Sequence, residues 1–202
     1  MRRSVRRPAP LFFRWLVAAL LLLGAAQATR YPLVVTDELG RELTLSAEPE
    51  RVVSMLPSHT ETLCAVGACS KLVGVDAFSD YPPEIQDLPR LGSGLTGAGG
   101  GPDLEQIVAL EPDLVLVSEF GELASQLEAA GLTVYAGSPQ TLAETYAFFA
   151  ILGELLNREA EAALLVGRVQ GEIAAVERLV TGLEPVRVYY ELDPTPYSVG
   201  PA

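Results

Sequence analysis

Histidine and cysteine, the side chains that most often bind transition metals, are scarce in this sequence. It has one His, His59, and two Cys, Cys64 and Cys69, among 202 residues. A zinc site takes three or four protein ligands, mostly His and Cys, and no HExxH motif or Cys/His cluster is present. The sequence therefore argues strongly against a zinc hydrolase.

The motifs of other common enzyme classes are also missing. No GxSxG nucleophile elbow is present, and no acid can be placed beside the pair Ser58-His59 to complete a catalytic triad. The Gly-rich stretch Gly97–Gly101 lacks a following Gly-Lys-Ser/Thr, and no GxGxxG follows a predicted strand. We therefore predict that the protein is not an enzyme. The stretch 97–101 is either a surface loop or a loop that covers a ligand.

Basic residues are few, with 14 Lys and Arg against 26 Asp and Glu and a net charge of −12. Five of the Arg residues lie in the first 28 positions, which contain no acid, so the rest of the chain carries −17. Affinity for nucleic acids comes mainly from Lys and Arg. We therefore do not expect a nucleic-acid partner.

The amino-terminal segment has the order of features of a secretory signal peptide. Its Arg-rich start is followed by the apolar run Leu16–Ala26 and then by the small-x-small motif Ala26-Gln27-Ala28. The run of about 11 residues is shorter than the roughly 20 that a membrane-spanning helix needs. We therefore expect residues 1–28 to be a cleaved signal peptide, with an uncleaved anchor as the alternative. No Cys lies at the cleavage point, so a lipid anchor is not expected.

The two cysteines allow two interpretations. Export would permit a disulfide, but one Cys-x4-Cys pair is too small to be a disulfide framework. Cys64 falls on the apolar side of a predicted helix. We therefore expect buried free thiols, with a Cys64–Cys69 bridge as the alternative.

Short apolar segments alternate with longer amphipathic ones from residue 31 onward, which predicts an α/β fold with a mostly parallel sheet. We expect strands at residues 31–36, 41–45, 51–56, 72–75, 114–118, 132–136 and 186–192. We expect helices at residues 60–66, 103–110, 123–130, 141–157 and 159–180, with a helical turn that begins at 82–83.

Several residues mark the ends of these elements. Gly40 suits the turn of a first hairpin, Asp103 is an expected N-cap, and Thr141 with Glu144 forms a capping box. The helix at 159–180 carries one apolar stripe, formed by Leu165, Val169, Ile173, Val176 and Val180. The strand expected at 186–192 has no neighbouring strand close to it in the sequence. It either joins the first sheet or begins a second domain, and we favour the second domain.

The segment Pro57–Glu61 lies between a predicted strand and a predicted helix. Backbone N–H groups at the start of a helix can bind an anionic or polar ligand group. The alternative is that Ser58 and Thr60 only cap the helix and that Pro57 ends the strand.

Five segments in this order resemble the amino-terminal lobe of the helical-backbone periplasmic binding proteins of ABC importers, closest to the vitamin B12-binding type. They are Arg51–Glu61, Leu72–Val75, Ser79–Pro83, Asp103–Leu110 and Glu111–Val117. The resemblance extends over about residues 31–200. It implies a Rossmann-like lobe at 29–157, a connector helix at 158–182 and the first strand of an incomplete second α/β lobe at 183–202.

The resemblance also implies which residues face the ligand. These residues are Pro57, Ser58, His59, Phe78, Ser118 and Phe120. Ser118 stands where cobalamin binders of this family have a Trp ring, and the only Trp of this chain, Trp15, lies in the expected signal peptide. Glu105 matches an acidic residue that docks onto arginines of the permease.

The function that the resemblance implies is capture of a metal chelate outside the cytoplasmic membrane by a monomer that delivers it to an ABC permease. Cobalamin or another corrinoid is the first expectation, followed by haem or a ferric siderophore. No cofactor other than this ligand is expected, and His59 is expected to neighbour the helix cap rather than bind a metal. The alternatives are a chelate-handling enzyme or metallochaperone of the same fold and a truncated, non-functional lobe.

Overall fold

The computed structural model describes residues 29–94 and 101–189, and the expected signal peptide lies outside these residues. The described chain begins with a two-stranded antiparallel hairpin of β1 (Leu33–Thr36) and β2 (Glu42–Leu45). Gly40 has a φ of 74° in the turn, as expected. The side chain of Asp37 accepts hydrogen bonds from the N–H groups of Leu39 (3.0 Å) and Arg41 (2.9 Å), which closes the turn.

The main sheet is fully parallel, which confirms the α/β fold expected from the alternating pattern. Its strands are β3 (Val52–Ser54), β4 (Leu72–Val75), β5 (Leu114–Val117) and β6 (Val134–Ala136), in the order β4-β3-β5-β6. All four residues of β5 are buried, as expected for a strand that is covered on both faces.

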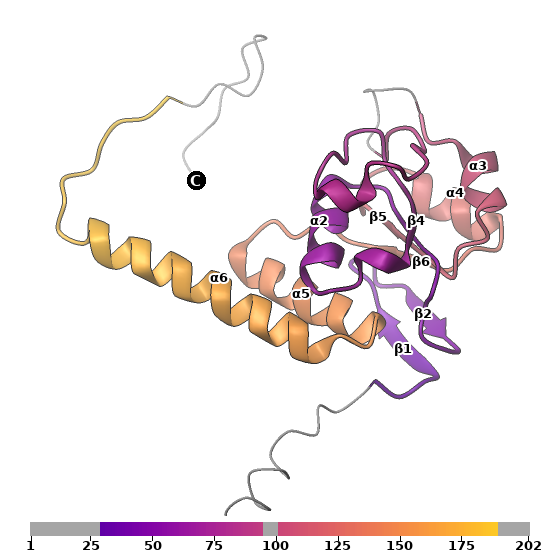
Figure 1. The fold of residues 1–202 in the computed structure, drawn as a ribbon, viewed down its shortest axis with the longest axis horizontal. Helices are drawn as coiled ribbons and strands as arrows, with labels where there is room; N and C mark the ends of the chain where they lie inside the picture. Colours follow the sequence, from indigo (N-terminus) through magenta and orange to yellow (C-terminus); the bar gives the residue numbers. More distant parts are fainter. Residues whose placement is uncertain (1–28, 95–100, 190–202) are drawn as a thin grey trace, which may run out of the picture. The chain divides into compact units, whose positions relative to one another are not determined.

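Helices cover both faces of the sheet (Figure 1). The helices are α2 (Pro57–Ala65), α3 (Leu104–Ala109), α4 (Leu123–Ala129), α5 (Leu142–Leu155) and α6 (Glu159–Val180), with 3₁₀ turns η1 (Cys69–Lys71) and η2 (Pro83–Ile85). On one face, Ile107 of α3 and Leu127 of α4 pack with Val53 and Val115 of the sheet in one core cluster. On the other face, Tyr135 of β6 packs against Phe148 of α5.

The expected helix ends are largely confirmed. Asp103 caps α3 by accepting a hydrogen bond from Gln106 N–H at 2.9 Å, and Thr141 with Glu144 forms the capping box of α5. Helix α2 begins earlier than expected, at Pro57, because Pro is well suited to the first turn of a helix, where its missing N–H is not needed.

The cysteines form a disulfide, so the expectation of buried free thiols is wrong. Cys64 and Cys69 are bonded, and their Cα atoms are 4.1 Å apart. Helix α2 ends at Ala65, and Gly67 adopts a φ of 79°, which turns the chain back so that Cys69 reaches Cys64. The bond joins the end of α2 to η1.

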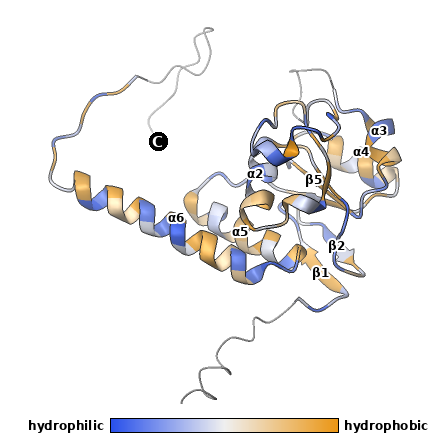
Figure 2. Ribbon diagram, in the orientation of Figure 1, coloured by the Kyte–Doolittle hydropathy of each residue, from blue (hydrophilic) through white to orange (hydrophobic). Residues whose placement is uncertain are grey.

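Helix α6 has the bounds expected from its apolar stripe, but the stripe is buried only near its start. Leu165 is buried, whereas Val176 and Val180 are 58% and 53% exposed. Figure 2 shows hydrophilic and hydrophobic residues alternating along this helix. One compact unit of the chain ends at Gly167, and a second unit begins at Arg168.

The strand expected at 186–192 is not formed in its described part. Residues 186–189 have no regular secondary structure, and Val186 and Val188 are each 82% exposed. Residues 190–192 lie outside the described residues. A strand needs a hydrogen-bonded neighbour, and the residues that the structure describes supply none for this segment.

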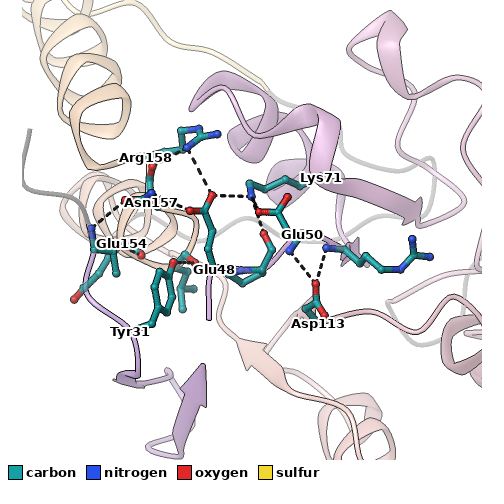
Figure 3. A network of polar contacts seen from close by, with 12 residues as sticks. Tyr31, Glu48, Glu50, Lys71, Asp113, Glu154, Asn157 and Arg158 are labelled. Carbon is teal, nitrogen blue, oxygen red and sulfur yellow. Dashed lines mark hydrogen bonds and ion pairs between the residues drawn. The ribbon is translucent and has the colours of Figure 1, made fainter. Parts of the chain in front are cut away.

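A polar network joins distant segments at the amino ends of the strands (Figure 3). The buried ammonium group of Lys71 contacts the carboxylates of Glu48 (2.8 Å) and Glu50 (3.0 Å) and donates a hydrogen bond to the Pro49 carbonyl (2.8 Å). The hydrogen bond from Lys71 lowers the pKa of Glu48, which also accepts a hydrogen bond from Asn157 Nδ2 at 2.9 Å. The network therefore fixes the segment before β3 to the turn between α5 and α6.

Candidate ligand-binding site

The loops that follow the four parallel strands all leave the sheet at the same edge, which we call the carboxyl edge. This edge is formed by the residues after Ser54, Val75, Val117 and Ala136, the last residues of β3, β4, β5 and β6. Open parallel sheets bind ligands at the carboxyl ends of their strands. All the ligand-facing residues expected from the sequence lie within five residues of one of these strand ends.

The turn from β3 into α2 presents the start of a helix at this edge. Leu56 is the N-cap residue, and no side chain caps the helix. The alternative interpretation, in which Ser58 and Thr60 act only as caps, is therefore wrong. Ser58 is exposed and Pro57 is half-buried. The N–H groups of the first helical turn have no partners within the helix, so they are suited to a polar ligand group.

A chain of buried hydrogen bonds holds this turn against the loop after β4. Thr60 Oγ1 donates to Ser54 Oγ at 2.8 Å and lies 3.0 Å from Ser79 Oγ. The Ser79 hydroxyl in turn donates to the carboxylate of Asp76. All four side chains are buried. Because each hydroxyl has a partner, the chain fixes the relative position of two loops of the carboxyl edge.

Three exposed aromatic side chains lie on these loops. Phe78 and Tyr81 follow β4 and are 48% and 61% exposed, and Phe120 follows β5 and is 61% exposed. The N–H of Phe78 donates to Asp76 Oδ2 at 3.0 Å, which fixes the backbone beneath its ring. Exposed rings on a fixed backbone provide flat apolar surfaces for a ligand. Sequence reasoning named Phe78 and Phe120 and missed Tyr81, although it quoted the segment that contains it.

Ser118 lies beneath this surface. It is 4% exposed, and its hydroxyl accepts hydrogen bonds from Phe120 N–H (3.2 Å) and from Ser138 Oγ (3.1 Å). The residue therefore joins the loop after β5 to the loop after β6. Its position supports Phe120 from below.

His59 lies inside the lobe and is 0% exposed. Its ring centroid is 4.8 Å from that of Phe148, and neither ring nitrogen has a hydrogen-bond partner of normal geometry among the described residues. Burial lowers the pKa of His59 to about 4, and the Gly137 backbone acts in the opposite direction. The imidazole is therefore neutral at pH 7.

Within residues 29–94 and 101–189, no group of three or more His, Cys, Asp or Glu side chains could hold a metal ion. In the same part of the chain, no helix has the length and apolar character needed to cross a membrane.

The loop from Leu91 to Gly94 passes close to the β3–α2 turn. A Cβ atom added to Gly94 would lie 2.1 Å from the Met55 carbonyl oxygen, so only Gly fits at this position. The Gly92 carbonyl accepts a hydrogen bond from Ala77 N–H at 2.7 Å. Most of the Gly-rich stretch 97–101 lies outside the described residues.

Glu105 is exposed in the first turn of α3, two residues after the N-cap Asp103. An acidic side chain is favourable at the start of a helix, where the helix dipole is positive. The carboxylate is therefore available to a basic partner.

A separate groove of about 740 Å³ lies between α5 and the first part of α6. Its lining residues are Tyr146, Ala150, Glu154, Glu159, Ala160, Ala162, Ala163 and Val166. None of these residues belongs to the loops of the carboxyl edge, and none was expected as a site from the sequence.

Comparison with known proteins gives consistent matches. The profile of a family described as periplasmic binding protein matches residues 52–201. The chain is 28% identical over 219 aligned positions to an uncharacterized ABC transporter substrate-binding lipoprotein of Bacillus subtilis, which covers 97% of this chain and 68% of that protein. It is 31% identical to a cobalamin-binding protein of Halobacterium salinarum, over 88% of this chain and 48% of that protein.

The fold also matches a solved structure. An ABC-type Fe3+-hydroxamate transport system protein of Saccharomonospora viridis has a TM-score of 0.62 and 28% identity, over 75% of this chain and 57% of that protein. The chain therefore spans about half to two thirds of the length of these three proteins.

Proposed function

The chain belongs to the periplasmic binding protein family, and on this basis we propose that it is an exported binding protein that captures a metal chelate for an ABC importer. The observation that carries the proposal is the carboxyl edge, where exposed aromatic rings and an uncapped helix start all follow the ends of parallel strands. This arrangement suits a large ligand with a flat apolar surface and polar substituents.

Cobalamin or another corrinoid is the ligand that we propose first. The relative from H. salinarum carries the name cobalamin-binding protein, and the rings of Phe78 and Phe120 could pack on a macrocycle. A ferric siderophore is the alternative, supported by the 28% identical structure from S. viridis. Haem also needs flat apolar contacts, so it is included with the corrinoid and the siderophore in the binding test below.

The buried and exposed residues of the site have different proposed roles. Pro57, Ser58, Phe78 and Phe120 contact the ligand, and Tyr81 joins them as a residue found only in the structure. Ser118 and His59 were also expected to face the ligand, but both are buried, so we propose that they stabilise the loops and do not contact the ligand. We propose no metal ligation by His59, since a single buried nitrogen is a poor metal site.

Export and permease docking complete the proposal. A Cys64–Cys69 disulfide is typical of an oxidising compartment outside the cytoplasm. We propose that the protein is a monomer and that Glu105 docks its first lobe onto a permease.

In the proposed domain organisation, residues 29–157 are the first lobe, α6 lies in the connector at 158–182, and residues 183–202 belong to the start of a second lobe. The relatives are named as substrate-binding and cobalamin-binding proteins, which supports a non-enzyme.

Calorimetric titration of the exported chain with cyanocobalamin, haemin and a ferric hydroxamate tests this function. We expect saturable one-to-one binding of one chelate and about tenfold weaker binding after Phe78→Ala or Phe120→Ala, because each ring contributes roughly 1.4 kcal/mol. Leu164→Ala, which removes an exposed apolar side chain of α6, is the control and should leave binding unchanged. A folded chain that binds none of the three chelates would refute the proposal.

A further inference from the structure

Thr29, the first residue that the structure describes, is attached to the turn between α5 and α6. Its backbone N–H donates to Asn157 Oδ1 at 3.0 Å, and its hydroxyl oxygen lies 2.9 Å from the Glu154 carbonyl oxygen. The same hydroxyl is hydrogen-bonded to the carboxylate of Glu159. These partners lie 125 to 130 positions further along the chain. The position of Thr29 is therefore held by contacts with distant parts of the chain.

The acceptor for the Thr29 nitrogen is itself held in place. Asn157 has a φ of 55°, a conformation that Asn tolerates better than most residues, and it ends the turn after α5. Its Nδ2 donates to Glu48 at 2.9 Å, so its Oδ1 remains for Thr29. Figure 3 shows Asn157 beside Glu154, Arg158 and Glu48.

The residues just before Thr29 form the small-x-small motif Ala26-Gln27-Ala28. The motif places the bond cut by a signal peptidase between Ala28 and Thr29, immediately before the first anchored residue. Cleavage of this bond follows from the proposed export, and we propose in addition that the new α-ammonium group of Thr29 binds the α5–α6 turn through Asn157 and Glu159. The hydrolysis consumes one water and leaves a carboxylate on Ala28 and an ammonium group on Thr29.

The local charges favour an ammonium group at this position. The carboxylate of Glu159 already contacts the Thr29 hydroxyl, and the Glu154 carbonyl belongs to the last turn of α5, where the helix dipole is negative. The positive start of α6 opposes the new charge, but Glu159 in the first turn of that helix offsets it. The neighbouring cation Arg158 donates a hydrogen bond to the Asn157 carbonyl (2.8 Å) and lies 3.9 Å from the carboxylate of Glu48.

The consequence is that processing stabilises the turn from which α6 begins. In the precursor the Thr29 nitrogen is an amide with one hydrogen to donate. After cleavage it is an ammonium group with three, and hydrogen bonds to charged groups are stronger than neutral ones. Removal of the signal peptide would therefore strengthen the attachment of the first residue to α5 and α6, independently of any ligand.

The first test is the amino terminus of the chain after export. The full 202-residue chain is expressed in a bacterial host, and the intact mass and amino-terminal sequence of the envelope fraction are determined. We expect a chain that begins at Thr29. A chain that begins at another residue, or that keeps residues 1–28, would overturn the proposed cleavage.

The second test compares the thermal stability of the processed chain with that of a chain that keeps Ala28 at its start. We expect the chain that starts at Thr29 to have a Tm about 3 °C higher, since one charge-assisted contact shifts the Tm of a domain of this size by a few degrees. Glu159→Gln should abolish the difference between the two starts. Glu161→Gln should preserve it, because Glu161 lies in the same helical turn without a contact to Thr29 in the described structure.

Equal melting temperatures for the two starts, or a difference that survives Glu159→Gln, would overturn the proposed contact. The stability comparison uses neither export nor a chelate, so a failure of the Thr29 contact is distinct from a failure of the proposed function.

Discussion

At the scale of single residues, the loops of the carboxyl edge depend on polar side chains buried beneath them. Ser54, Thr60, Asp76 and Ser79 satisfy one another through hydrogen bonds. His59 differs from them, because it is fully buried without a hydrogen-bond partner of normal geometry among the described residues. A buried imidazole without partners costs stability, and the cost grows when the ring has to take up a proton.

The first prediction is that His59 makes the folded chain sensitive to mild acid. Its folded-state pKa of about 4 lies below the ordinary 6.5, so the unfolded chain binds the extra proton first. The contribution of neutral His59 to stability is complete above pH 6.5 and is lost as the pH falls towards 4. Between pH 7 and pH 5, we expect the free energy of unfolding to fall by about 2 kcal/mol from this group.

Urea unfolding of the wild type and of His59→Leu at pH 7 and pH 5 measures this contribution. The carboxylates titrate in both proteins, so the difference between them isolates His59. Identical pH dependence of the two proteins would show that His59 is already solvated or charged in the folded state.

At the scale of secondary-structure elements, the lobe is held together at both edges of its sheet. At the carboxyl edge, hydrogen bonds join the loops after β3 and β4, and Ser118 with Ser138 joins those after β5 and β6. At the opposite edge, Lys71 joins η1 to the segment before β3, which in turn contacts the α5–α6 turn (Figure 3). The Cys64–Cys69 disulfide fixes η1 to α2. These contacts place the elements that carry the candidate site.

The second prediction concerns the network around Lys71. Lys71→Met removes a cation whose side chain is 6% exposed and leaves Glu48 facing the interior without its main partner. We expect the free energy of unfolding to fall by about 2 to 3 kcal/mol, below the full range for a buried pair because both carboxylates are partly exposed.

Chemical denaturation at pH 7 measures this loss. Arg168→Ala is the matched control, because it breaks an ion pair with Glu172 in which both side chains are about two-thirds exposed or more (67% and 73%). That change should alter stability by less than about 0.5 kcal/mol. Equal effects of the two substitutions would mean that the Lys71 network is solvated.

At the scale of the whole molecule, the chain is strongly acidic. The chain without residues 1–28 carries −17, and Glu105 adds an exposed carboxylate at the start of α3. Complementary charges steer association and fix the orientation of a complex. This charge supports the proposed docking of the chain onto a basic surface of a permease.

The third prediction is that Glu105→Lys impairs delivery without impairing capture. Charge reversal at a docking contact costs several kcal/mol, so we expect chelate uptake by cells that carry the permease to fall about tenfold or more. Chelate affinity measured by calorimetry should stay unchanged. Glu161→Lys changes the net charge equally on exposed α6 and should leave uptake near the wild-type level. Equal uptake by both variants would exclude docking through Glu105.

The sequence by itself determined the features that depend on nearby residues. The alternation of apolar segments predicted the parallel sheet, and the Asp103 cap, the Thr141 capping box and the Gly40 turn were predicted because each acts within about four residues. Phe78 and Phe120 were named through the resemblance to the family, and the predicted strands before them placed both at the carboxyl edge.

Only the tertiary structure decided which of these residues face outward and which distant residues meet. Burial of His59 and Ser118, exposure of Tyr81 and attachment of Thr29 to Asn157 depend on contacts between separate segments. Formation of the disulfide needed the turn at Gly67, and the segment 186–189 lacks a strand because a strand requires a neighbour. Local patterns define elements, whereas burial and pairing arise from packing between elements that the sequence pattern does not specify.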